Sequence, residues 1–201
     1  MARSAGRSRV FVALELGLAV RDLAEEAIAH LHAVLRDRAG LRFIRPPDLH
    51  VTLAFLGELE APGLASLGEL VAAVAREHAP LDAEAGGLGA FPRPEGAHVL
   101  WLGFGSENPA LGRLVADLHT RLRAAGHALE SRPWNGHVTL ARCRSRGGLD
   151  ARAAFAGAPD RRVACRVEAL VVMESRLRPD GSHYTPIFRV LLSGGTQRER
   201  V

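Results

Sequence analysis

The chain of 201 residues contains no lysine and only two cysteines. Without lysine it has no residue to carry the adenylate of an ATP-driven nucleic-acid ligase, and it also lacks a glycine-rich nucleotide-binding loop. Two cysteines are too few for a disulfide framework or a cysteine-rich zinc site. Purely apolar runs extend over only a few residues, which excludes a membrane-spanning helix. We therefore expect a cytoplasmic protein with reduced cysteines and no membrane association.

Charge is distributed unevenly along the chain, although the net charge is only +4. Residues 1–100 carry 13 acidic residues and 10 arginines, whereas residues 101–201 carry 16 arginines and 9 acidic residues. Eight of these arginines, with only two acidic residues, lie between Arg132 and Arg166. This stretch is either a solvated surface or a surface that receives a polyanion.

Apolar periodicity changes repeatedly between the helical and the extended repeat. It predicts helices over Arg21–Ala39, Pro62–Ala79, Asn108–Ala125 and, in short form, residues 150–156. It predicts strands over Arg9–Leu16, Leu41–Ile44, His50–Leu56, Leu81–Phe91, Ala97–Phe104, His137–Cys143, Val163–Met173 and Thr185–Leu192. The order strand, helix, strand, helix, strand occurs twice, which indicates an internal duplication.

Neither half has enough apolar surface to close a core easily, so we expect two lobes of one domain over residues 9–192. The lobes are expected at roughly 9–93 and 94–192, with an exchange of strands between them left open. The proline- and glycine-rich segment Phe91–Gly96 is the expected junction. Residues 1–8 and 193–201 are expected to be flexible tails. Nothing in the sequence indicates an obligate partner, so a monomer is expected.

One tetrapeptide occurs twice, because His50–Leu53 and His137–Leu140 both read His-Val-Thr-Leu. The composition of the chain predicts about 0.003 copies by chance. Each copy lies in a predicted strand, where alternate residues point to the same face. The histidine and threonine therefore share one face, while the valine and leucine face the core. If a pseudo-two-fold axis relates the halves, both His/Thr pairs face one groove.

Two histidines and two threonines in one groove suit phosphoester chemistry. A neutral imidazole takes a proton from an attacking water or hydroxyl, and a protonated imidazole gives one to the leaving oxygen. Threonine hydroxyls donate hydrogen bonds to non-bridging phosphate oxygens. This scheme needs neither a metal nor a cofactor. The alternative is a duplicated strand motif with a purely structural role.

Around these motifs the sequence resembles the 2H phosphoesterase superfamily. Within it, the chain is similar to the RNA 2′,3′-cyclic phosphodiesterases, also known as LigT-like, ThpR-type or 2′-5′ RNA ligase family proteins. The resemblance covers nearly the whole chain, and its signatures are Arg9–Leu14, Arg45–Gly57, Gly89–Pro92, Val99–Gly103, Arg132–Trp134, His137–Arg142 and Ser175–Gly181 with Tyr184. One departure is Gly136, where the family often has proline directly before the second histidine. Glycine at this place is expected to loosen the entry to the strand and to leave the His/Thr pair intact.

The resemblance implies a bilobed α+β fold, with antiparallel sheets around a central groove that both motifs face. It implies hydrolysis of an RNA 2′,3′-cyclic phosphate to a 2′-phosphomonoester. Carried over to this chain, His50 is the general acid on the O3′ leaving group and His137 is the base that activates water. The near symmetry of the groove leaves the reverse assignment open. Thr52 and Thr139 are expected to bind the phosphate oxygens.

Three further residues are expected at the site. Arg142 has the reach to offset phosphate charge, but strand parity points it away from His137, so this role needs a bulge or the strand end. Phe11 and Tyr184 are expected to bind the substrate, since a base stacks well on an aromatic ring. Packing in the core is the alternative role for Phe11.

Two other functions remain open beside hydrolysis of RNA ends. One is RNA binding or reversible 2′-5′ RNA end joining, in which a ribose hydroxyl replaces water. The other is hydrolysis of a small cyclic nucleotide such as ADP-ribose cyclic phosphate, because the two His/Thr pairs contact only the phosphate. A steep fall of binding with salt indicates many phosphate contacts and favours a polymer.

Overall fold

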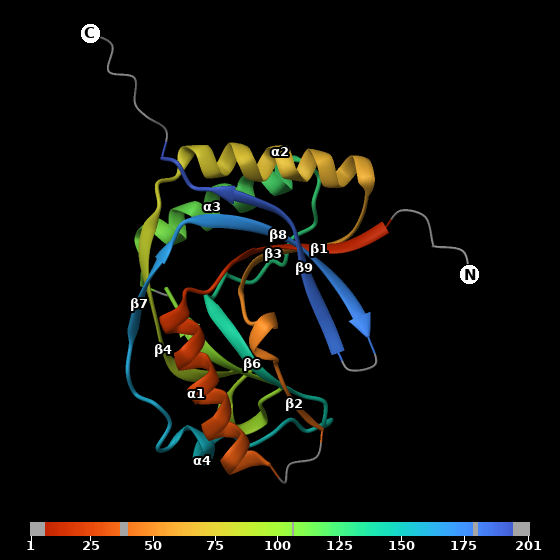
Figure 1. Cartoon of the computed structure of the whole chain (residues 1–201). Helices are drawn as coiled ribbons and strands as arrows, with labels where there is room; N and C mark the ends of the chain where they lie inside the picture. Colours follow the sequence, from red (N-terminus) through yellow and green to blue (C-terminus); the bar gives the residue numbers. More distant parts are fainter. Residues whose placement is uncertain (1–6, 37–39, 106, 179–180, 195–201) are drawn as a thin grey trace.

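One curled antiparallel sheet of nine strands runs through the molecule (Figure 1). The computed structural model describes residues 7–36, 40–105, 107–178 and 181–194. The strands are β1 (Arg7–Leu14), β2 (Leu41–Phe43), β3 (Val51–Glu60), β4 (Leu81–Phe91), β5 (Val99–Phe104), β6 (His137–Cys143), β7 (Val163–Val167), β8 (Ala169–Arg178) and β9 (Gly181–Leu191). The helices are α1 (Leu18–Leu35), α2 (Ala61–Glu77), α3 (Pro109–Ala124) and α4 (Arg152–Phe155), with 3₁₀ turns at Pro46–Asp48 and Pro94–Gly96.

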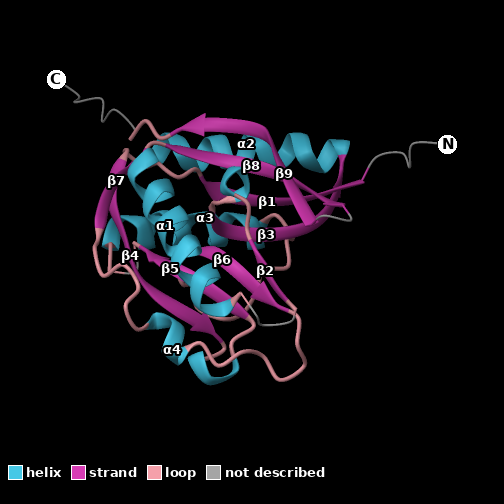
Figure 2. Ribbon diagram, turned by 60° about the horizontal axis from the view of Figure 1, so that its bottom comes forward, coloured by secondary structure: helices cyan, strands magenta, loops and turns pink. Residues whose placement is uncertain are grey.

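The sheet divides at its centre into two halves. Its strand order is β7-β4-β5-β6-β3-β1-β8-β9, with β2 paired to β6. Helix α1 packs on β6, β7 and α4, whereas α2 packs on β3, β8, β9 and α3 (Figure 1, Figure 2). Every strand pair is antiparallel. The α+β class and the antiparallel sheet expected from the sequence are therefore confirmed.

The two structural halves exchange elements of the sequence halves. Strand β4 comes from the first half of the chain, yet it pairs with β5 and β7. Strands β8 and β9 come from the second half, yet β8 pairs with β1. A boundary between residues 93 and 94 thus falls between two strands that pair with each other. The lobes of this protein are spatial units and do not follow the order of the chain.

Helix positions follow the apolar periodicity of the sequence. The leucines that recur along the third predicted helix are all buried, namely Leu111, Leu114, Leu118 and Leu122. Asn108 precedes this helix, and its Oδ1 accepts hydrogen bonds from the backbone N–H groups of Ala110 and Leu111 at 2.9 and 3.0 Å. The side-chain cap satisfies two donors that a helix start leaves unpaired, which fixes where α3 begins.

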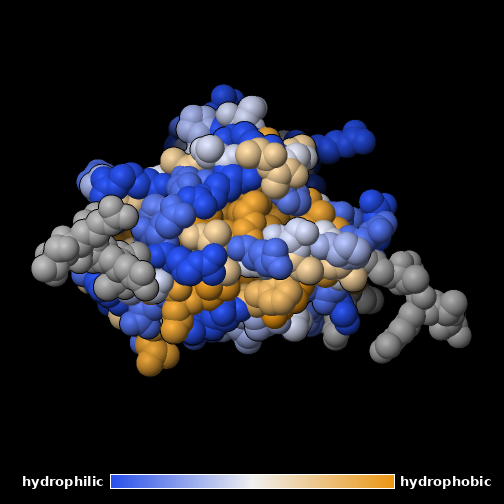
Figure 3. All heavy atoms as spheres, turned by 90° about the horizontal axis from the view of Figure 1, so that it is seen from above, coloured by the Kyte–Doolittle hydropathy of each residue, from blue (hydrophilic) through white to orange (hydrophobic). Residues whose placement is uncertain are grey.

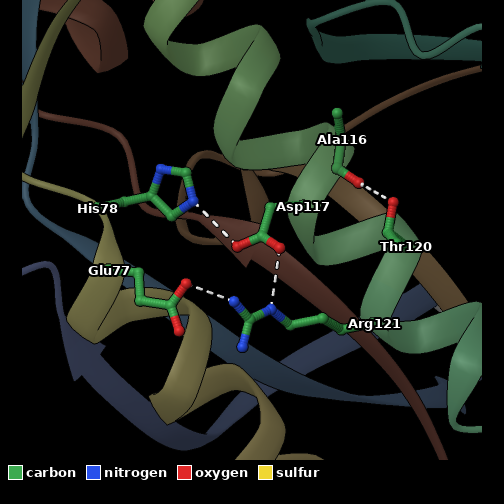
Figure 4. Close-up of polar contacts among 6 residues, drawn as sticks. All are labelled: Glu77, His78, Ala116, Asp117, Thr120 and Arg121. Carbon is green, nitrogen blue, oxygen red and sulfur yellow. Dashed lines mark hydrogen bonds and ion pairs between the residues drawn. The ribbon is translucent and has the colours of Figure 1, made fainter.

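A polar network joins the end of α2 to α3 (Figure 4). His78 Nε2 lies 3.1 Å from Asp117 Oδ2, and Arg121 Nε donates to Asp117 Oδ1 at 2.9 Å. The same guanidinium is paired with Glu77. Because these side chains join the end of α2 to α3, the network fixes the two helices relative to each other.

Several element boundaries differ from those expected. The apolar run Val163–Met173 is two strands, because the chain leaves β4 at Val167 and joins β1 as β8. Apolar periodicity cannot reveal such a change of pairing partner. Helix α1 begins at Leu18, and residues 37–39 of its expected end lie outside the described residues.

The expected tails overlap with ordered structure. Arg7 and Ser8 belong to β1, and Ser193 donates a backbone hydrogen bond to Ala75. The rest of the expected tails, 1–6 and 195–201, lies outside the described residues.

Seen from above, apolar and hydrophilic side chains alternate over the face that carries α2 (Figure 3). None of the helices in the described ranges combines the length and hydropathy needed to cross a membrane.

Candidate active site

The two His-Val-Thr-Leu copies meet at the centre of the sheet. Strands β3 and β6 pair through a single residue pair, Val51 with Val138. The residues that flank an antiparallel pair are neighbours, so His50 lies beside Thr139 and Thr52 lies beside His137. His50 and His137 are thus diagonal neighbours across the strand pair. Cβ atoms in this position are about 7 Å apart. All four polar side chains are half-buried, and both valines are fully buried, as the alternation predicts.

Both histidine rings are oriented by the same backbone contact. His50 Nδ1 lies 2.6 Å from the carbonyl oxygen of Asp48, and His137 Nδ1 lies 2.8 Å from that of Asn135. Each carbonyl belongs to the residue two positions before the histidine. Because a carbonyl only accepts, Nδ1 carries the proton in both rings. Nε2 is therefore the nitrogen of each ring left for proton transfer.

A β-bulge follows each motif at the same position. Leu53 has no partner in the register of β3 with β1, and Leu140 has none in the register of β6 with β5. A bulge shifts the alternation of a strand by one residue. Arg142 is consequently exposed on the groove side rather than turned away, as strand parity alone would have placed it. Phe55 occupies the corresponding place in the first copy and is 61% exposed.

Aromatic rings pack against both histidines. The His50 ring lies 4.8 Å from the ring centroids of both Phe11 and Tyr184. The His137 ring lies 5.0 Å from Phe91 and 6.1 Å from Trp101. Phe11 is only 1% exposed, so of its two expected roles, core packing behind His50 agrees with this burial.

Burial lowers the pKa of both histidines below the usual 6.5. For His50, the hydrogen bond to the Asp48 carbonyl raises the pKa, and the positive charge of Arg142 lowers it further. For His137, the hydrogen bond to the Asn135 carbonyl raises the pKa, and the positive charge of Arg142 lowers it. One guanidinium thus lowers the pKa of both rings, in addition to the larger effect of burial.

A groove of about 470 Å³ opens over the motif strands. Four expected site residues line it, namely Thr52, His137, Thr139 and Arg142. His50 and Tyr184 lie beside it rather than in its lining. The remaining lining includes residues that the sequence did not assign to the site: Phe55, Phe91, His98, His119, Leu129, Glu130, Arg132 and Trp134.

Two of these unassigned side chains hold the bulge of β3. Trp134 Nε1 donates to the carbonyl oxygen of Thr52 at 2.9 Å, and His119 Nε2 lies 2.8 Å from that of Leu53. A bulge leaves backbone groups without ladder partners, and these two side chains satisfy them. The Arg-Pro-Trp signature before the second motif was a signal for Trp134, whereas nothing in the sequence distinguished His119.

Asp48 is the one buried charged residue among the described residues, with 6% exposure. Its carboxylate accepts hydrogen bonds from Arg45 Nε at 2.7 Å and from the backbone N–H of Tyr184 at 3.4 Å. Arg45 also reaches His183 Nδ1 at 2.9 Å. The carboxylate thereby ties the turn before His50 to β9. Because the backbone carbonyl of Asp48 orients the His50 ring, this network also positions the histidine.

Gly136 fits a place where no larger residue does. Its backbone oxygen accepts from Phe104 N at 2.9 Å, and a Cβ at position 136 would overlap the carbonyl oxygen of Phe104. The sequence suggested that glycine here, in place of the family's proline, would loosen the entry to the strand. The structure instead shows a tight approach of two backbones that requires glycine.

Clusters of three or more His, Cys, Asp or Glu side chains suited to a metal ion do not occur among the described residues.

The eight arginines of the stretch 132–166 differ in whether they are paired with carboxylates. Four of them pair with carboxylates, in the pairs Arg132–Glu130, Arg152–Asp150, Arg161–Glu26 and Arg166–Asp82. These pairs neutralise half of the arginine charge of the stretch.

The sequence matches a family model described as the 2′-5′ RNA ligase superfamily over residues 19–178. Curated proteins named RNA 2′,3′-cyclic phosphodiesterase are similar to it. The protein of Aeropyrum pernix is 34% identical over 111 residues, which are 55% of this chain and 62% of the relative. That of Geobacillus stearothermophilus is 33% identical over 68% of this chain and 42% of the relative. The chain thus spans less than two thirds of both relatives. That of Methanothermobacter thermautotrophicus is 28% identical over 90% of this chain and 98% of the relative.

Solved structures share the fold over almost the whole chain. The crystal structure of TT0787 from Thermus thermophilus superposes with a TM-score of 0.74 and 27% identity, over 92% of this chain and 98% of that one. Escherichia coli LigT, solved with 3′-AMP, gives a TM-score of 0.73 and 24% identity, over 93% and 99% of the two chains. These superpositions agree with the curled antiparallel sheet described above.

Proposed function

This chain belongs to the 2′-5′ RNA ligase superfamily, and from that premise we propose that it hydrolyses 2′,3′-cyclic phosphates at RNA ends to 2′-phosphomonoesters. The name RNA 2′,3′-cyclic phosphodiesterase, which its curated relatives carry, supports this substrate class. The observation that carries the proposal is the matched pair of histidines. Both rings hold Nδ1–H against a backbone carbonyl, and both leave Nε2 for the shared face of the sheet.

In the proposed reaction, the cyclic phosphate lies over the Val51–Val138 pair, between the two imidazoles. His137 Nε2 removes a proton from water as the water oxygen forms a bond to phosphorus. The bond from phosphorus to O3′ breaks, and His50 Nε2 gives its proton to O3′. The phosphate stays on O2′, so the product is a 2′-phosphomonoester. The two rings exchange protonation states over one turnover.

The threonines and Arg142 are suited to the charge that this reaction develops. The Thr52 and Thr139 hydroxyls flank the Val51–Val138 pair on the same face as the histidines, where they donate to non-bridging phosphate oxygens. Arg142 follows the bulge of β6 and adds a positive charge on this side of the groove. When the anionic phosphate binds, its charge opposes that of Arg142 and raises the pKa of the histidine that must be protonated.

The test is hydrolysis of an RNA oligonucleotide that ends in a 2′,3′-cyclic phosphate, in buffer with EDTA. Wild type is compared with His50→Ala, His137→Ala and His32→Ala, the last removing an exposed histidine of α1. Loss of either motif histidine is expected to lower kcat by about 10²- to 10⁴-fold, whereas His32→Ala retains the wild-type rate. The product is identified as the 2′- or 3′-phosphate isomer.

The roles of the two histidines are separated with a cyclic substrate that has sulfur at the 3′ bridging position. A thiolate leaves without a proton, so this substrate restores turnover of the variant that lacks the general acid. Rescue of His50→Ala supports the assignment, and rescue of His137→Ala reverses it. A folded wild-type protein that releases no 2′-phosphate from the RNA would contradict the proposal and move the assignment to small cyclic nucleotides.

A further inference from the structure

Two arginines stand opposite each other beside the groove. Strand β2 pairs with β6 so that Arg42 is the direct cross-strand partner of Arg142. Direct partners in an antiparallel pair point to the same face, with Cβ atoms about 5 Å apart. Arg142 lines the groove, so Arg42 extends the same face outward from it. Like charges directly opposite each other destabilise a sheet unless something neutralises them.

No carboxylate of the described residues forms an ion pair with Arg42 or Arg142. This contrasts with Arg132, Arg152 and Arg166 of the same arginine-rich half, each of which has an acidic partner within 2.9 Å. Positive charge that the described carboxylates leave unbalanced thus lies at this end of the groove. Arg144, exposed two residues beyond Arg142, adds to it.

The Arg42 side chain is packed rather than free to turn away. It is half-buried, and its guanidinium lies against the backbone of Gly181 at the start of β9. A Cβ at Gly181 would overlap this guanidinium, and the φ of +133° at Gly181 also favours glycine. The start of β9 therefore restrains the Arg42 guanidinium, while the backbone register places Arg42 opposite Arg142. A guanidinium fixed in this way loses little further freedom when it binds an anion.

Along β6, His137 and Thr139 come before Arg142, and Arg42 stands opposite Arg142 on β2, so an anion held by both arginines lies farther along the strand pair than the reacting phosphate. We propose that Arg42 and Arg142 form a second phosphate subsite, which takes the internucleotide phosphate on the 5′ side of the nucleotide that carries the cyclic phosphate. The inference rests on the proposed function and adds that the substrate has at least two nucleotides. A cyclic mononucleotide lacks the phosphate that this subsite binds.

The test compares two product-like ligands that differ by one internucleotide phosphate and nucleoside. The probes are adenosine 2′-monophosphate and the dinucleotide ApA with a terminal 2′-phosphate. Their dissociation constants are measured by calorimetry at several salt concentrations for wild type, Arg42→Gln and Arg166→Gln. Wild type is expected to bind the dinucleotide about tenfold more tightly, with a salt slope larger by about 0.7 for the additional phosphate contact.

Arg42→Gln is expected to remove most of this tenfold preference and the additional salt dependence. Arg166→Gln removes the same charge at the far edge of the sheet and is expected to keep both. The ratio of kcat/KM for ApA 2′,3′-cyclic phosphate over adenosine 2′,3′-cyclic phosphate should fall in the same way in Arg42→Gln. A third probe, adenosine 2′,5′-bisphosphate, has a phosphate on the 5′ side but no second nucleoside. It should regain much of the dinucleotide's higher affinity if the phosphate is what the subsite binds.

Three results would overturn the subsite. The first is that Arg42→Gln keeps the preference for the dinucleotide. The second is that Arg42→Gln loses affinity equally for both ligands, which would assign Arg42 to the reacting phosphate or to folding. The third is a wild type with equal affinity for the mononucleotide and dinucleotide. These binding measurements need no turnover. A protein that shows the preference but hydrolyses no cyclic phosphate would contradict the proposed function and leave the subsite supported.

Discussion

At the scale of single residues, Arg142 is a charged group that acts on both motif histidines. Its charge lowers the pKa of His50 and of His137, in addition to the larger effect of their burial. A bell-shaped profile of kcat/KM reports the pKa values of the free enzyme. With both values below 6.5, the wild-type profile is expected to be centred below pH 6.5.

Removing this charge should move the profile in a known direction. In Arg142→Gln the protonated form of each histidine no longer faces a positive neighbour, so both pKa values rise and the bell moves to higher pH. The lost contact with phosphate should also lower kcat/KM at the optimum by about 10- to 100-fold. The measurement is kcat/KM from about pH 4 to 9. A bell that keeps its position in Arg142→Gln would be inconsistent with the described site, and Arg161→Gln serves as the charge-matched control.

At the scale of the elements, the sequence predicted the strands that carry the two motifs. It missed the bulge and the long-range side-chain contact that position these strands. The bounds of β4 and β6 agree with the expected ones, because alternation and apolar content are local properties. The bulge at Leu140 depends on the partner strand, so strand parity alone placed Arg142 on the opposite face. His119 carries no signal in the sequence, because its contact with the Leu53 carbonyl joins positions 66 residues apart.

The entry to β6 makes a test at this scale. A methyl group at position 136 would overlap the Phe104 carbonyl, and two paired backbones cannot easily move apart. Gly136→Ala is expected to lower the free energy of unfolding by about 1–3 kcal/mol. Gly112→Ala is the matched control, because its Cβ would meet open space on α3 and alanine favours the helix by up to ~1 kcal/mol. Chemical denaturation measures both, and equal stability of the two variants would contradict the described packing.

At the scale of the whole molecule, the exchange of strands makes each half depend on the other. A fragment that ends at residue 93 contains β4 without its partners β5 and β7, and β1 without β8. A fragment that begins at residue 94 contains the β8–β9 hairpin without β1 or α2. Apolar faces that the intact chain buries would be exposed in both fragments.

We therefore expect neither fragment, 1–93 or 94–201, to fold by itself, and an equimolar mixture to regain structure. Circular dichroism and the dispersion of amide proton resonances distinguish these states. Cooperative unfolding of either isolated fragment would show that the sequence halves are independent units. The repeated motif indicated a duplication, but the sequence could not reveal the exchange, because strand order depends on contacts between distant segments.

The orientation of the two histidine rings also determines how the site returns to its starting state. In the proposed reaction, one turnover adds a proton to the ring of His137 and removes one from the ring of His50. Each Nδ1–H faces a backbone carbonyl, which is too weak a base to pass a proton inward. Both corrections must therefore run through Nε2 and the water that refills the groove. In this proposal, water restores the protonation states of both rings, and water is also the molecule consumed in hydrolysis.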